Sequence, residues 1–134
     1  MAGKSVPLVM LPRYSTFAGL TAATPYPGFK TVAMDVSDYQ SAVLNVWRGR
    51  LVLGVGITTT FALTAEESTD QETWSTCAGT NCSSFDPGPD TEGQVTATLK
   101  KRWFRVRVAL ALTQGSAFPQ ITCWAVGFLE QRKK

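Results

Sequence analysis

The chain has 134 residues and a mass of 14.5 kDa, a size that fits one domain with a core of its own. Its net charge of +3 is too small and too scattered to predict nucleic-acid binding. It contains no histidine, the commonest general base and metal ligand, and we find no nucleophile elbow, phosphate loop or metal-ligand triad. We therefore expect no enzyme activity, no catalytic residues, no cofactor and no bound metal.

Residues 1–29 predict an extended arm. Four prolines prevent a stable helix, yet the segment is too apolar to be a solvated tail. The arm either folds over the domain's own core, with residues 7–10 as an edge strand, or lies on a neighbouring subunit. The candidate partner contacts in the arm are Pro7, Leu8, Met10, Leu11, Tyr14 and Phe17.

The arm shows no secretory signal, because proline interrupts its short apolar run. No apolar stretch reaches the length of a membrane-spanning helix. We expect a protein that is made in the cytoplasm without a signal peptide and that does not contact a membrane.

From residue 30 onward, strand patterns and turn residues alternate at short intervals. Strands are predicted at residues 30–36, 41–47, 51–57, 58–67, 94–100, 102–112 and 120–130. The last of these is apolar on both faces, which predicts a position inside a sheet.

Residues 102–112 have the clearest pattern and predict a central strand. A period of two places Trp103, Arg105, Arg107 and two alanines on one side. The other side is apolar and consists of Phe104, Val106, Val108, Leu110 and Leu112. We expect the apolar side to build the core and the basic end of the other side to meet solvent, acidic groups or a partner.

These patterns together predict an all-β protein. We expect an antiparallel β-sandwich or jelly roll of about seven or eight strands over residues 30–134, preceded by the arm at 1–29.

Residues 75–93 predict one long polar loop, a kind of segment that is usually functional or mobile. Cys77 and Cys82 lie in it and could form a disulfide in an oxidising environment, whereas Cys123 is expected to be buried and inert. Asn81 begins a glycosylation-type triplet.

The same loop carries Asp86, Asp90 and Glu92, whose oxygens could bind calcium. Their spacing matches no dedicated calcium loop, so a solvated turn is the favoured interpretation.

Residues 57–130 resemble the second half of a discoidin-like jelly roll. Ser68, Asp70 and Trp74 match the turn of that family, and Arg105 matches an arginine in its following strand. The chain lacks the glycine that follows the aspartate there, and it lacks the N-terminal half that supplies many ligand and calcium loops. The resemblance implies binding of a carbohydrate or lipid at a loop formed by Trp74, Asn81, Asp86 and Asp90.

In style the chain also resembles virion proteins of tailed phages, which include small all-β proteins with sticky arms. That resemblance implies a non-enzymatic structural protein of the virion, a capsid decoration (cement) or head-associated protein. It would bury its arm and one sheet face on the major capsid protein, other virion subunits or further copies of itself, with Arg105 and Arg107 setting the charge register. The alternative function is a discoidin-like carbohydrate-binding module that adheres to surface glycans.

Two clusters have open interpretations. The basic residues at 100–107 could bind phosphates and stack a base on Trp103, but the acidic residues at 66–72 supply enough counter-charge to favour cross-strand pairing. Trp47, Trp74 and Trp124 could line a sugar platform or pack in the core.

Overall fold

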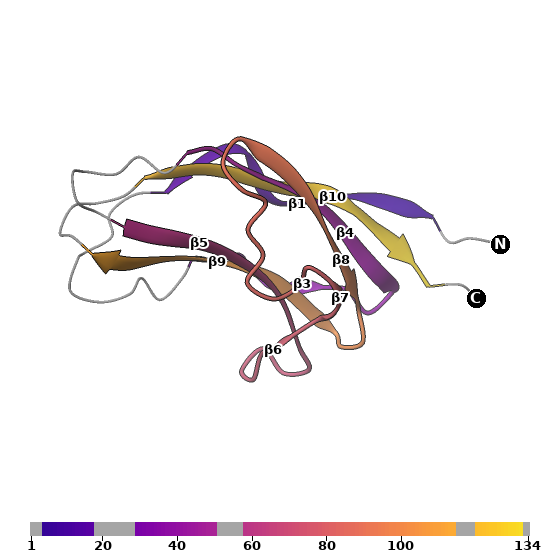
Figure 1. The fold of residues 1–134 in the computed structure, drawn as a ribbon. Helices are drawn as coiled ribbons and strands as arrows, with labels where there is room; N and C mark the ends of the chain where they lie inside the picture. Colours follow the sequence, from indigo (N-terminus) through magenta and orange to yellow (C-terminus); the bar gives the residue numbers. More distant parts are fainter. Residues whose placement is uncertain (1–3, 18–28, 51–57, 115–119, 133–134) are drawn as a thin grey trace.

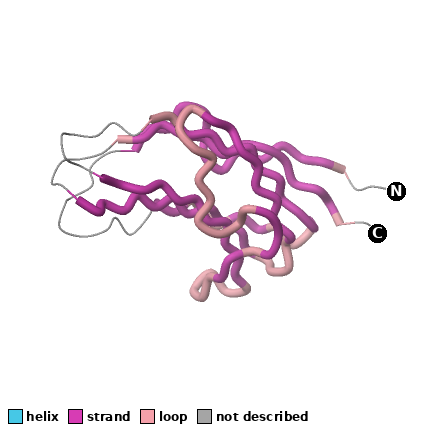
Figure 2. Tube along the Cα trace, in the orientation of Figure 1, coloured by secondary structure: helices cyan, strands magenta, loops and turns pink. Residues whose placement is uncertain are grey.

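The protein is all-β in the computed structural model, which describes residues 4–17, 29–50, 58–114 and 120–132. Within these ranges ten strands form two antiparallel sheets that lie one above the other (Figure 1). Figure 2 shows strands and loops throughout the described part of the chain, which contains no helix long and apolar enough to cross a membrane. The predicted β-sandwich is confirmed.

The first sheet has the strand order β1-β10-β4-β8-β7. Its strands are β1 (Ser5–Phe17), β10 (Ile121–Gln131), β4 (Tyr39–Arg48), β8 (Thr91–Thr98) and β7 (Ala78–Thr80). β10 lies between β1 and β4, which confirms that this strand is inside a sheet. β1 is an edge strand that includes residues 7–10, so this part of the predicted arm belongs to the first sheet.

The second sheet has the strand order β2-β9-β5-β6, and β3 also pairs with β9. Its strands are β2 (Phe29–Lys30), β9 (Trp103–Gln114), β5 (Thr58–Ser68), β6 (Ser75–Thr76) and β3 (Met34–Asp35). The predicted strand at 30–36 is therefore two short pieces. Between them the Val106 amide donates to the hydroxyl of Thr31 at 2.9 Å, so a side chain replaces a backbone acceptor in the ladder.

The core lies between the sheets. The predicted apolar side of β9 is confirmed, because Phe104, Val106, Val108 and Leu110 are all buried. The side chains of Phe17 and Leu112 and the predicted strand at 51–57 lie outside the described residues. The second sheet also contributes Phe61 and Leu63, and the first sheet contributes Leu8, Leu44, Val46, Val95, Ile121 and Leu129.

The prediction of one long loop over residues 75–93 is wrong, because β6 and β7 form within this segment. The remainder crosses between the two layers (Figure 1). Leu63 of β5 and Phe85 exchange backbone hydrogen bonds of 2.9 and 2.8 Å, and the Asp90 amide donates to the Arg48 carbonyl of β4 at 2.9 Å. The segment thus joins the two sheets along one side of the sandwich through backbone bonds, which leave no apolar periodicity in the sequence.

Candidate functional site

The outer surface of the first sheet is mostly apolar across three strands, with Asn45 of β4 as a polar residue in its middle. Alternation along β4 turns Leu44 and Val46 into the core and places the side chains between them on the outside. The register sets the outward residues of β1, β10 and β4 beside one another. We call this surface the apolar face; it consists of Pro7, Val9, Tyr14, Val43, Trp47, Trp124, Val126 and Phe128. Val9 is 58% exposed and Tyr14 is 73% exposed, so part of this face is open to solvent.

A bulge in β1 shapes one end of the apolar face. The register shifts so that residues 12–14 lie opposite Trp124 of β10, and Tyr14 has a φ of 64°, in the left-handed region. The Tyr14 ring meets Trp124 edge-on with centroids 5.5 Å apart, and the Arg13 guanidinium lies 5.2 Å from the Trp124 centroid. Trp47 stacks on Trp124 at 4.4 Å. Bulges of this kind re-aim side chains, and backbone strain often marks functional sites.

The charged residues bordering the apolar face lie at its two ends. Glu130 lies at one end of the face, following Phe128 along β10. Arg13 and Glu92 lie at the other end, on either side of the Trp47–Trp124 pair. The middle of the face is free of charged side chains among the described residues, so covering it would not bury a charge.

The outer surface of the second sheet is charged. Nε of Arg105 lies 3.0 Å from Oε1 of Glu66, and Nε of Arg107 lies 3.5 Å from Oε2 of the same carboxylate. These pairs confirm cross-strand pairing for both arginines. The Arg105 guanidinium lies 3.9 Å from the ring centroid of Trp74. A polar recess of about 510 Å³, which we call the cationic recess, is lined by Lys30, Glu66, Gln71, Glu72, Trp74, Arg105 and Arg107.

The remaining basic residues of β9 and the turn before it also have partners within the chain. Arg102 pairs with Asp35 of β3 at 3.0 Å. The carboxylate of Glu67, a buried residue, accepts the backbone amides of Lys100 and Lys101 at 2.9 and 3.1 Å. These amide bonds therefore hold the β8–β9 turn.

The turn on which the discoidin-like resemblance rests is closed by its own hydrogen bonds. Oδ1 of Asp70 accepts the amides of Thr73 and Glu72 and the hydroxyl of Ser68, each at 2.9 Å. These bonds hold the pKa of Asp70 below its ordinary value. The turn leads directly to Trp74, which it places in the cationic recess.

The four residues of the predicted ligand loop do not converge. Trp74 belongs to the cationic recess, whereas Asn81 donates to a backbone carbonyl of β8 at 2.9 Å. Asp86 and Asp90 each form an ion pair with an arginine. The described residues contain no cluster of three or more acidic, histidine or cysteine side chains that could hold a metal ion.

Asp86 fastens the 75–93 segment to β4. Its carboxylate accepts Nε and Nη2 of Arg48 at 2.6 and 3.0 Å and the amide of Gly88 at 2.9 Å. Burial alone would raise the pKa of Asp86, but the Arg48 guanidinium and the Gly88 amide outweigh it and hold the pKa below its ordinary value. Asp90 instead pairs with Arg50 at an exposed position.

The predicted partner contacts in the arm divide by the direction of their side chains. Leu8, Met10 and Leu11 are buried in the chain's own core and are not available to a partner in this fold. Alternation along β1 accounts for the burial of Leu8 and Met10, and the register shift between Val9 and Leu11 turns Leu11 inward as well. Pro7 and Tyr14 are exposed and lie on the apolar face.

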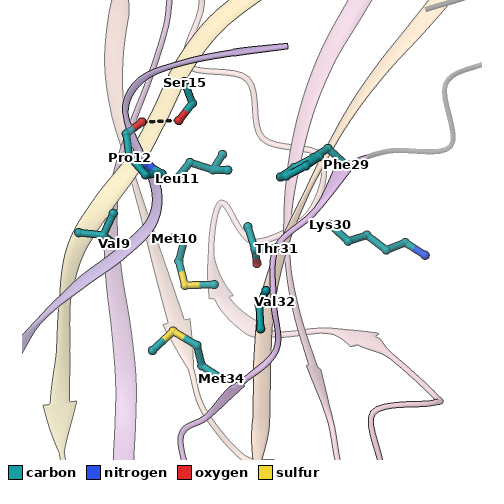
Figure 3. Close-up of a pocket in the computed structure, with 10 residues that line it drawn as sticks. All are labelled: Val9, Met10, Leu11, Pro12, Ser15, Phe29, Lys30, Thr31, Val32 and Met34. Atoms are coloured by element: carbon teal, nitrogen blue, oxygen red, sulfur yellow. Dashed lines mark hydrogen bonds between the residues drawn. The ribbon is translucent and has the colours of Figure 1, made fainter. Parts of the chain in front are cut away.

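A groove of about 390 Å³ separates β1 from β2 and β3 (Figure 3). Its lining comes from β1 on one side and from residues 29–34 on the other, and includes Met10, Met34 and the highly exposed Val32. It lies on the side of the sandwich away from the segment that joins the sheets.

Cys77, Cys82 and Cys123 are free, buried thiols. The predicted burial of Cys123 is confirmed, and the disulfide considered for the other two is not formed in this structure. Burial raises the pKa of Cys123 to about 12 and also raises the pKa values of Cys77 and Cys82. Because the thiolate is the reactive form, all three are chemically protected.

The three tryptophans considered as a sugar platform lie on opposite faces. Trp47 and Trp124 stack on the apolar face, whereas Trp74 lies under Arg105. Sequence reasoning did not find the apolar face as a unit. The sequence shows apolar residues at the outward positions of the predicted strands at 41–47 and 120–130. It does not show that these two strands pair with each other, which is what joins the residues into one face.

Neither a scan of protein-family models nor searches of curated proteins and solved structures found a match to this chain.

Proposed function

We propose that this chain is a non-enzymatic structural protein of a virus particle, a decoration or head-associated subunit that docks through the apolar face. The observation that carries the proposal is the largely apolar surface over β1, β10 and β4, in which Asn45 is the polar residue at the centre. Large exposed apolar patches mark interaction surfaces. Covering such a face contributes about 25 cal/mol per Å² of apolar area removed from water.

The occupant of the face is a second copy of the chain. The charged residues of the face lie at its ends, Glu130 at one and Arg13 and Glu92 at the other. Two copies related by a two-fold axis would place their apolar centres together and bring Arg13 of one copy toward Glu130 of the other. Such a contact closes as a dimer, and each dimer would join two neighbouring positions of a shell.

The alternative of a carbohydrate-binding module draws less support from the geometry. The Arg105 guanidinium covers one face of the Trp74 ring. The side chains of Asn81, Asp86 and Asp90 bind groups of the chain itself. The predicted ligand loop therefore offers few free groups to a sugar.

Light scattering on the full chain tests the proposal. We expect a molar mass that rises with concentration to a dimer or larger assembly, and we expect Val9→Asp to restore the monomer. Val9 is already 58% exposed, so the substitution places a charge on the face without burying it in the core. Circular dichroism confirms that the variant is folded.

The matched control is Val32→Asp. Val32 is 87% exposed and lines the groove but does not belong to the apolar face. It should leave the assembly unchanged. A chain that stays monomeric at all concentrations, or an assembly that Val32→Asp dissolves and Val9→Asp does not, would contradict docking of a second copy on the apolar face.

A further inference from the structure

The cationic recess carries more positive charge than the fold uses. It is lined by three cations, Lys30, Arg105 and Arg107, and by two carboxylates, Glu66 and Glu72. Lys30 and Arg107 are direct cross-strand partners of β2 and β9. Like charges opposite one another destabilise a sheet, so this arrangement costs stability unless an anion lies between them.

The one buried carboxylate in the recess is already committed. Glu66 is a buried residue, and it holds Arg105 at 3.0 Å and Arg107 only at 3.5 Å. The side chain of Arg107 is 34% exposed, against 14% for Arg105. Lys30 forms no ion pair within the described part of the chain. Arg107 and Lys30 are therefore the cations with donors to spare.

We propose that the cationic recess binds the carboxylate of an acidic side chain on a protein partner. The excess of one positive charge over the two carboxylates matches a single negative charge, and Glu66 and Glu72 would repel a dianion more strongly. Arg107 supplies paired N–H donors to the carboxylate and Lys30 supplies a third. This surface lies on the outer side of the second sheet, so it is separate from the apolar face and does not depend on its function.

The neighbourhood of Trp74 argues for a side chain and against an acidic sugar. A sugar is bound by stacking on an open aromatic face, but the Arg105 guanidinium lies 3.9 Å from the Trp74 ring centroid. Glu66 also pairs with Arg105, so the guanidinium is held by the carboxylate as well as by the Trp74 ring. The recess thus has donors for a carboxylate, and the guanidinium of Arg105 covers the Trp74 ring face beside them.

Titration with acetate, followed by NMR at constant ionic strength, tests the site. We expect saturable shifts of the Arg107 Nε and Trp74 indole signals, and a loss of affinity of about fivefold or more in Arg107→Gln and in Lys30→Gln. The matched control is Arg102→Gln, because Arg102 is an exposed arginine of the same region that pairs with Asp35 outside the recess. It should bind acetate as the wild type does.

Two further arms decide the class of ligand. Glucuronate should bind no more tightly than acetate, and sulfate should bind more weakly. Tighter binding of glucuronate by about tenfold would overturn the assignment in favour of an acidic glycan. Shifts that never saturate, or an Arg102→Gln variant that loses as much affinity as Arg107→Gln, would show that the recess is not a carboxylate site.

Discussion

The ion pair between Arg48 and Asp86 contains the least exposed arginine of the ion pairs described in the fold, so it should be sensitive to loss of its carboxylate. The side chain of Arg48 is 9% exposed and that of Asp86 is 37% exposed, so the two partners differ in their access to water. Asp86→Asn removes the negative charge and leaves the guanidinium of Arg48 buried without a counter-ion. Its one other described hydrogen bond goes to the carbonyl of Gly49 at 3.2 Å.

The expected cost follows from this asymmetry. Removing one partner of a fully buried ion pair costs about 3–5 kcal/mol. Water reaches Asp86 and can take over part of its role, which lowers the expected loss to about 2 kcal/mol. For a chain of this length that corresponds to a fall of roughly 8 °C in Tm. Arg48→Met should cost less, because Asp86 is partly solvated and the new apolar side chain can still contact Phe61.

The assay is chemical denaturation of the wild type and the variants at several pH values. The pKa of Asp86 is lower in the folded state, so its contribution is present above the ordinary carboxyl pKa of about 4 and is lost as pH falls through the folded value. The difference between wild type and Asp86→Asn should therefore shrink in acid. Asp90→Asn is the matched control, because Asp90 and Arg50 are both more than half exposed, and it should cost less than about 0.5 kcal/mol.

Two outcomes would refute this reasoning. One is an Asp86→Asn variant as stable as Asp90→Asn. The other is an Arg48→Met variant less stable than Asp86→Asn, which would mean that the carboxylate and not the guanidinium is the group left without solvation.

Two other substitutions or treatments have clear expected results. Gly127→Ala places a Cβ against the backbone carbonyl of Val43 between β10 and β4, so we expect a loss of at least about 2 kcal/mol in the free energy of unfolding; a neutral effect in denaturant titrations would contradict the close approach of these strands. Cys77, Cys82 and Cys123 are buried with raised pKa values, so a thiol reagent at pH 8 should modify them only as fast as the protein opens; rapid modification of native protein would show that they are accessible.

Alternation predicted the strands that carry the core. In β9 the residues from Phe104 to Leu110 alternate without interruption, and the structure buries the expected side. In β10 both faces are apolar because one meets the core and the other forms part of the apolar face. The local pattern and the tertiary structure agree here because side chains alternate between the two faces of a strand. Only one register therefore places the apolar set of β9 in the core.

The features that escaped prediction depend on contacts between distant residues. The break at Thr31 comes from a side-chain hydroxyl that bonds Val106. The 75–93 segment looked like a loop because its sheet pairing uses backbone groups beneath polar side chains. The bulge that sets Tyr14 against Trp124 leaves no mark on hydrophobic periodicity. Cross-strand pairing of Arg105 was predicted, but its particular partner Glu66 and the separation of the tryptophans required the strand order, which composition does not specify.

Hydroxyl-radical footprinting of the dispersed and the assembled protein tests the central claim most directly. Dilution sets the two states, and mass spectrometry gives the oxidation rate of each aromatic side chain. If the apolar face is the docking surface, Tyr14 and Phe128 should be oxidised more slowly in the assembled protein. Trp74 and Trp103, on the outer side of the second sheet, should keep their oxidation rates. An assembly in which Tyr14 and Phe128 stay as reactive as in the monomer would contradict it.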